Sequence, residues 1–181
     1  MRVESISAIV RTPHNAIVRR ISSTSRPSRR TACARTPAPA VRALKGHGLS
    51  EGVCNHFSVE LPDASGRFLL NPRGLLWSEI GADDIVLVDA DGTVLAGRHP
   101  VESTDMFIHA AVHRIAGKAC VLHTHMPYAT ALTLTRSRAL DTTLSQNAMR
   151  FHGRTAADAH YNGLALDSAE GERIAHAMQD L

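Results

Sequence analysis

The chain has 181 residues, of which 44% are apolar and 20% are charged, and its formal net charge is +3. A chain of this length can bury one sizeable core, so we expect a single soluble domain, and no run reaches the ~20 apolar residues that a membrane-spanning helix needs. The three cysteines are odd in number and show no Cys-x-x-Cys spacing, which argues against a disulfide framework or a cysteine zinc site and indicates a reducing compartment.

The basic charge is concentrated at the N-terminus. Residues 1–42 hold nine arginines, no lysine and one acid, Glu4, whereas residues 43–181 carry a net charge of −5. We predict a disordered, arginine-rich leader over 1–42, with a linker at 36–40, in a cytoplasmic protein. A segment rich in arginine and serine with few acids also resembles an organelle transit peptide, here within 1–40, and a start site placed too early would leave the same pattern. A nucleic-acid-binding arm is disfavoured, because the leader has no aromatic residue and no lysine.

Two segments that follow the leader have the pattern of β-hairpins. The first joins residues 57–61 to residues 67–70 through the turn sequence Pro-Asp-Ala-Ser-Gly. The second joins residues 85–88 to residues 93–95 through Asp-Ala-Asp-Gly. Two successive hairpins predict an antiparallel sheet.

Helical spacing begins after the second hairpin. Ser103 or Thr104 can cap a helix whose apolar residues recur every three or four positions, and Gly117 can end it. The same reading predicts a buried strand over 119–122 and helices over 129–134 and 169–178. The elements add up to an α+β or a three-layer α/β/α domain built on a mostly antiparallel sheet.

The stretch VLHTHMPYA places two histidines at the end of the predicted strand. His123 and His125 point to the same face because side chains alternate along a strand, so both imidazoles can reach one cation. Two ligands do not complete a catalytic zinc site, which usually has three protein ligands and an open position. Ordinary hydrogen bonds at a strand end are the alternative.

The order of several motifs resembles the class II aldolase/adducin family, and the wording is most similar to its adducin-like branch. The motifs are GVCNHFS from Gly52, FLLNPRGLLWSEI from Phe68, DIVLVD from Asp84, VLHTHMPYATA from Val121, QNAMRFHG from Gln146 and YNGLAL from Tyr161. The resemblance implies an α/β, three-layer α/β/α class II aldolase-like domain over 43–181. It also implies that the C-terminal strands of the domain lie beyond Leu181, so we expect an incomplete sheet.

The resemblance further implies a zinc site. His123 and His125 match two of the family's three zinc histidines, and the third follows in a strand for which this chain has no counterpart before Leu181. A third ligand would then come from another chain, from His176, or be absent. At the position of the family's acid/base glutamate this chain has Asp105, and Glu102 lies close enough in sequence to replace it.

Substrate-binding residues are implied in the same way. The resemblance assigns them to two anion-binding loops and to the start of the helix after residue 102; they are Asn55, His56, Arg73, Gly74, Ser103 and Thr104. Alternatives stay open, since Ser103 and Thr104 can be helix caps and Arg73 a solvated turn residue. Asp105, His109 and His113 recur at four-residue intervals and could imitate a metal stripe, but the family does not use those two histidines as ligands.

Two classes of function follow from the resemblance. The first is a zinc-dependent aldolase-type lyase, or an epimerase, that acts on a phosphorylated sugar or a sugar acid and that forms a homo-oligomer when its domain is intact. This protein could be inactive because its domain is incomplete. The second is an adducin-like, non-catalytic protein that binds actin or the cytoskeleton. Neither class predicts a nucleic-acid or membrane partner.

Overall fold

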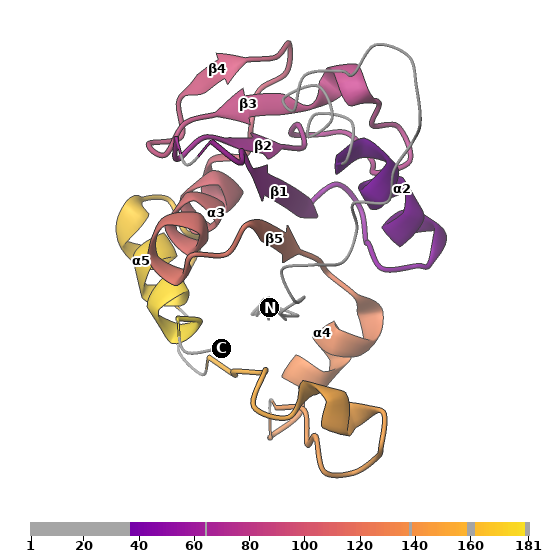
Figure 1. The fold of residues 1–181 in the computed structure, drawn as a ribbon. Coiled ribbons are helices and arrows are strands. Elements are labelled where there is room, and N and C mark those ends of the chain that lie inside the picture. Colours follow the sequence, from indigo (N-terminus) through magenta and orange to yellow (C-terminus); the bar gives the residue numbers. More distant parts are fainter. Residues whose placement is uncertain (1–36, 64, 138, 159–161, 180–181) are drawn as a thin grey trace.

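A five-stranded antiparallel sheet forms the centre of the molecule. The computed structural model describes residues 37–63, 65–137, 139–158 and 162–179. The strands are β1 (His56–Glu60), β2 (Phe68–Leu70), β3 (Val86–Val88), β4 (Val94–Ala96) and β5 (Cys120–His123). Their order in the sheet is β4-β3-β2-β1-β5, so the first and last of these strands in the sequence, β1 and β5, lie side by side (Figure 1).

Both predicted hairpins are confirmed. In the first, Val59 of β1 lies opposite Leu69 of β2. In the second, β3 pairs with β4 around a turn in which the Asp89 carboxylate accepts hydrogen bonds from the backbone N–H groups of Asp91 and Thr93. A short aspartate side chain can satisfy such turn amides locally, which explains why this turn was readable from sequence.

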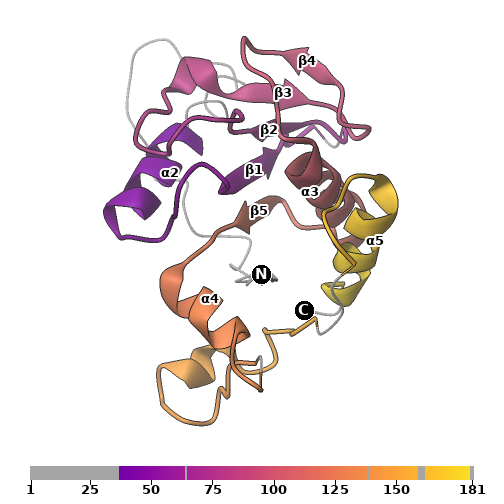
Figure 2. The same ribbon diagram turned by 180° about the vertical axis from the view of Figure 1, so that it is seen from behind.

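Helices cover both faces of the sheet, in agreement with the predicted three layers. Four α-helices and two 3₁₀ helices are present in the described residues: α2 (Pro37–Gly46), η1 (Ala82–Asp84), α3 (Ser103–Ala116), α4 (Pro127–Thr133), η2 (Ala148–Phe151) and α5 (Ser168–Ala177). Leu69 packs with α2, whereas its neighbours Phe68 and Leu70 pack with α3. Side chains alternate along β2, so this pattern places α2 and α3 on opposite faces, as Figure 2 shows from behind.

The helix at the N-terminal edge of the described chain corrects one prediction. Residues 36–40 were interpreted as a linker, but Pro37 begins α2, and Ala38 and Val41 are buried against the sheet. Proline is tolerated in the first turn of a helix because the N–H groups there have no intrahelical partner. The folded part therefore begins before the boundary at residue 43. Residues 1–36 lie outside the described residues, so the leader itself stays a prediction.

The start of α3 corrects a second prediction. Neither Ser103 nor Thr104 caps this helix; the N-cap position is Glu102, whose carbonyl accepts the Met106 N–H at 3.0 Å and whose side chain makes no cap bond. The side chain of Glu102 is instead paired with Arg73. The other end of α3 is as predicted, because Gly117 adopts a left-handed conformation with φ of 62°.

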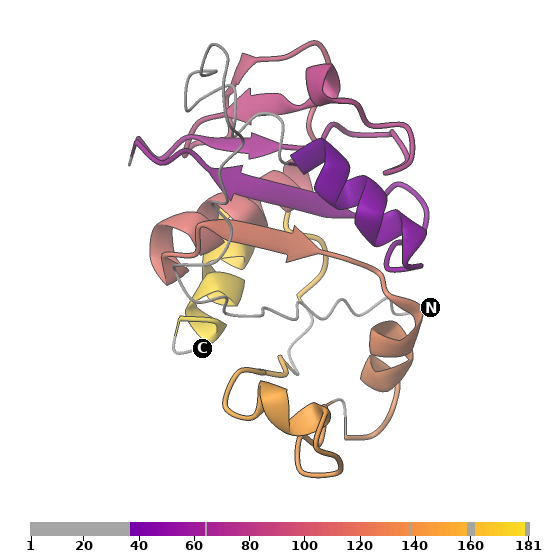
Figure 3. The same ribbon diagram turned by 45° about the vertical axis from the view of Figure 1, so that its right-hand side comes forward.

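The remaining elements lie beside and below the sheet. α5 packs along α3 through Ala111, Val112 and Ala175. The segment from α4 to η2 lies away from the sheet, beyond the end of β5 (Figures 1 and 3). In the described part of the chain, no helix is both long and apolar enough to cross a membrane.

Candidate metal centre

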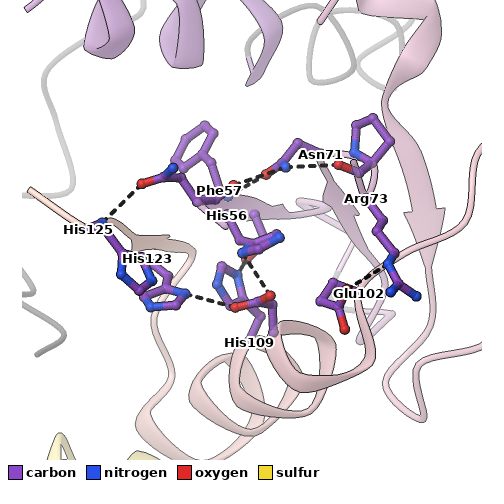
Figure 4. A network of polar contacts seen from close by, with 12 residues as sticks. His56, Phe57, Asn71, Arg73, Glu102, His109, His123 and His125 are labelled. Atoms are coloured by element: carbon purple, nitrogen blue, oxygen red, sulfur yellow. Dashed lines mark hydrogen bonds and ion pairs between the residues drawn. The ribbon is translucent and has the colours of Figure 1, made fainter. Parts of the chain in front are cut away.

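Three side chains from three elements meet where β1, β5 and α3 come together. His56 of β1 lies directly opposite His123 of β5 in the antiparallel pair. The two imidazole rings are stacked, with centres 6.0 Å apart and planes inclined by 23°. Asp105, in the first turn of α3, reaches the same point from the helical layer. Figure 4 shows the two histidines at this point.

Asp105 contacts both histidines. The Nδ1 atom of His123 donates a hydrogen bond of 2.8 Å to Asp105 Oδ1. The Nδ1 atom of His56 lies 2.8 Å from Asp105 Oδ2, a close ionic contact without good hydrogen-bond alignment. Each carboxylate oxygen thus has one imidazole. The arrangement holds two rings on neighbouring strands around one carboxyl group.

The carboxyl group is buried and ionised. Burial on its own would raise the pKa of Asp105, but the hydrogen bond from His123 and the close contact with His56 outweigh burial and hold that pKa well below its usual range. A buried carboxylate is costly unless it is paired or binds a cation. The negative charge is therefore available at neutral pH to histidine protons or to a metal.

The donor set is of a kind that can hold a metal ion. One donor atom each from His56, Asp105 and His123 lie within 4.8 Å of one another, and no other group of three potential ligands is that close in the residues described. Two imidazoles and a carboxylate are one of the usual three-ligand sets of catalytic zinc, which leave a fourth position for water or substrate. These residues can therefore hold the ion without a further histidine.

His125 lies next to this group. Its ring centre is 5.0 Å from that of His123, and its backbone N–H donates to Asn55 Oδ1 at 3.0 Å. Burial lowers the pKa of His125, so its imidazole is neutral at neutral pH, which is the form that binds a metal. It is not a member of the close group of three, and its role as a ligand stays a prediction.

Asn55 holds the strand ends in place. Its amide is buried, and besides accepting from His125 it donates to the carbonyl of Glu51 at 2.7 Å. The backbone carbonyl of Asn55 accepts a hydrogen bond from Trp77 Nε1 at 2.9 Å and another from Asn71 Nδ2 at 3.2 Å. These bonds fix the loop before His56 against β5. A direct contact between Asn55 and substrate stays a prediction.

The predicted anion-binding residues lie at the edge of the same site. The Arg73 guanidinium is 62% exposed and its Nε atom lies 2.8 Å from Glu102 Oε2 (Figure 4). Gly74 has φ of 80°, a turn conformation that suits glycine. Ser103 is exposed and Thr104 is half-buried. Substrate binding by these four residues and proton transfer by Glu102 remain predictions.

The sequence analysis placed His56 among the substrate-binding residues and did not predict its contact with Asp105. That contact depends on how α3 packs on β1, and it joins residues 49 positions apart, which leave no local signal. Ser58 was also missed; it follows His56 on the same face of β1 and contacts two histidines of α3. Period-two spacing from His56 was the one available indication.

The chain is similar in sequence to a known domain family. The family model described as "Class II Aldolase and Adducin N-terminal domain" matches residues 37–180. An adducin-related protein of Schizosaccharomyces pombe is 32% identical over 149 residues, which are 76% of this chain and 44% of that protein. The chain thus spans less than half the length of this relative.

Two solved structures have a similar fold. An aldolase II superfamily protein from Pseudomonas syringae superposes with a TM-score of 0.76 and 30% identity, over 85% of this chain and 62% of the other. An L-fuculose 1-phosphate aldolase from Glaciozyma antarctica superposes with a TM-score of 0.68 and 23% identity, over 87% of this chain and 62% of the other. At that level of identity the second likeness concerns the fold alone.

Proposed function

Since the chain belongs to the class II aldolase and adducin family, we propose that it is a zinc-dependent lyase, or an epimerase, acting on a phosphorylated sugar or a sugar acid. The observation that carries the proposal is the ionised Asp105 carboxylate, buried between His56 and His123. Strongly perturbed titratable groups cluster at functional sites, because purely structural positions rarely retain such costly charges.

The chain's own residues would supply two functions at this site, metal binding and proton transfer. His56, Asp105 and His123 hold the cation, and β1, β5 and α3 fix their positions before anything binds. A bound zinc would act as a Lewis acid toward negative charge that develops on substrate oxygens. Asp105 is unprotonated, so it can accept a proton from a sugar hydroxyl, with Glu102 as the alternative carrier.

Arg73 is suited to bind the anionic end of the substrate. Its ion pair with Glu102 is solvent-accessible, with the Arg73 side chain 62% and the Glu102 side chain 29% exposed, and surface pairs contribute about 0–1 kcal/mol. A phosphate or carboxylate, which a guanidinium can bind through two parallel hydrogen bonds, can therefore displace Glu102 from Arg73. Release of Glu102 would free that carboxylate at the edge of the metal centre.

The test is cleavage of a carbon–carbon bond in the presence of zinc. The zinc-loaded protein is incubated with a panel of phosphorylated ketoses and sugar acids, and aldehyde products and epimers are detected by mass spectrometry and NMR. We expect Asp105→Asn to abolish turnover. His152→Ala is the matched control, because His152 is exposed and, among the described residues, its side chain bonds only Thr142. Zinc-loaded protein that converts no member of the panel would contradict the proposal.

A second candidate is a non-catalytic interaction protein. The likeness to the adducin-related protein of S. pombe supports it, with actin or another cytoskeletal protein as partner. Sedimentation with actin filaments distinguishes the two candidates: the enzyme should stay in the supernatant, and the interaction protein should pellet whether or not zinc is present. Sedimentation equilibrium of the protein alone, without actin, would test the expected homo-oligomer.

A further inference from the structure

Ser58 connects β1 to two histidines of α3 beneath the metal centre. The serine is fully buried, and its Oγ atom lies 2.6 Å from His109 Nδ1 and 2.7 Å from His113 Nε2. His109 is also fully buried, and its remaining nitrogen, Nε2, has no hydrogen-bond partner among the described residues. A hydroxyl group carries one proton, so it can donate to only one of the two rings.

The carbonyl group of Lys118 determines the direction of these bonds. It lies 2.6 Å from His113 Nδ1 and can only accept, so His113 Nδ1 carries a proton. Burial lowers the pKa of His113 to about 4, so the ring is neutral at neutral pH and its Nε2 atom is an acceptor. The Ser58 hydroxyl must therefore donate to His113.

The state of His109 follows from that of Ser58. Once the serine proton points to His113, the Ser58 oxygen can only accept, and His109 must donate from Nδ1. The Nε2 atom of His109 is then a bare lone pair. This agrees with its burial, because an N–H group at the same place would be a buried donor without an acceptor. In this series of hydrogen bonds, His109 donates to Ser58, Ser58 donates to His113, and His113 donates to the carbonyl of Lys118.

The contact between Ser58 and His109 also aligns α3 with β1. His56 and Ser58 are two residues apart and share one face of the strand, a separation of about 6.6 Å. Asp105 and His109 are four residues apart and share one face of the helix, a rise of about 6 Å. The two spacings match, so the Ser58–His109 contact and the His56–Asp105 contact lie next to each other. Sliding the helix along the strand would break both.

We infer that Ser58 is a positioning residue for the metal centre: its hydroxyl holds His109 in the Nδ1–H tautomer and fixes α3 on β1 in the register that brings Asp105 to His56 and His123. The inference rests on the proposed metal site for its effect on zinc, but the tautomer and the register belong to the protein without metal. The tautomer is unusual enough to be diagnostic, because it can be read directly from imidazole nitrogen chemical shifts.

The experiment compares the wild-type chain with Ser58→Ala by nitrogen NMR of the metal-free protein and by zinc titration. Wild-type His109 and His113 should both show Nδ1–H. In Ser58→Ala, His109 should revert to a population with mostly Nε2–H, whereas His113 should keep Nδ1–H because Lys118 still accepts from it. The His56 and His123 signals should shift, and zinc affinity should fall about tenfold to a hundredfold, the usual loss when a group that orients a ligand is removed.

Ser50→Ala is the matched control. Ser50 is another buried serine, and its hydroxyl has no partner in the part of the chain that the structure describes, so its removal should change neither the tautomers nor the affinity for zinc. Retention of Nδ1–H by His109 in Ser58→Ala, with unchanged His56 and His123 signals, would overturn the inference. If Ser58→Ala does not fold, the wild-type spectrum decides, because Nε2–H on either His109 or His113 would overturn it. If the wild-type chain binds no zinc, the proposed function fails, and the tautomers and imidazole shifts alone decide the inference.

Discussion

Asp105 accounts for most of the chemistry at the scale of single residues. Its carboxylate is paired with two imidazoles and stays ionised despite burial. The sequence suggested a proton-transfer role for Asp105 through resemblance, but the structure gives it two neighbours that can share a cation with it. The proposed roles of Asp105 as base and as ligand are therefore coupled, because any cation between the histidines would also change the proton affinity of the carboxylate.

The buried histidines of α3 predict a loss of stability in acid. The pKa of His113 is about 4 in the folded protein, because burial disfavours the imidazolium, against 6.5 ordinarily. Between these values the unfolded chain binds more protons than the folded one, so the free energy of unfolding should fall as the pH drops from about 6.5 to about 4. The full contribution of His113, about 3 kcal/mol at most, is present above that window.

Urea unfolding at a series of pH values checks this prediction. His113→Gln does not titrate and can still donate to the Lys118 carbonyl, so its stability should depend less on pH over this window. Burial also lowers the pKa of His109, so this residue supplies part of the remaining dependence of stability on pH. An identical slope in wild type and His113→Gln would show that His113 is already accessible to solvent protons.

At the scale of elements, the contact between α3 and α5 depends on one glycine. A Cβ atom added to Gly171 would lie 2.5 Å from the backbone carbonyl oxygen of Phe107, closer than such atoms approach in proteins. Gly171→Ala should therefore push α5 away from α3 and lower the free energy of unfolding by about 1–3 kcal/mol, the usual cost of overpacking. Chemical denaturation measures this change.

Gly46→Ala is the control for that substitution. A Cβ atom at Gly46 would meet nothing within 4 Å, and alanine restricts the unfolded chain more than glycine does. Its stability should be unchanged or slightly higher. Equal destabilisation by Gly46→Ala and Gly171→Ala would mean that the close approach of α5 to α3 carries no energy.

The elements also show which parts of the fold were readable from sequence. The two hairpins and α3 were predicted because their signals are local: turn residues between alternating segments, and apolar residues every three or four positions. α2 was missed because Pro37 and Pro39 indicate a loop by composition, whereas the burial of Ala38 and Val41 against the sheet makes the segment a helix. Tertiary packing outweighed local propensity there.

The residues of the candidate site were also predictable from sequence only where their signals are local. His123 and Asp105 were identified from residues and motifs that lie within single elements. The place of His56 beside them depends on the pairing of β1 with β5 and on the packing of α3. The hydrogen bonds between Ser58 and the histidines of α3 depend on how α3 packs on that pair of strands. Neither set of contacts leaves a periodic signal, because His56 lies 49 positions from Asp105 and 67 from His123, and Ser58 lies 51 positions from His109.

At the scale of the whole molecule, limited digestion locates the start of the folded part. Trypsin should cut after arginines within 1–36 before it cuts after those beyond residue 66, if the leader is unpacked as its composition predicts. Arg42 should resist, because it lies in α2 and donates to the Ile80 carbonyl at 3.1 Å. Early cleavage after Arg42 would restore the boundary at residue 43, and protection of the leader arginines would mean that the leader is packed.

Zinc titration of the wild-type chain and of His56→Ala tests the central claim most directly, because His56 separates the structural centre from the His123–His125 pair that the sequence alone suggested. The wild-type chain should bind one zinc ion, and His56→Ala should bind it about a hundredfold more weakly or not at all, since loss of one of three ligands leaves an incomplete site. His152→Ala should bind like wild type. Unchanged zinc stoichiometry and affinity in His56→Ala would contradict the account and return the metal to the other histidines.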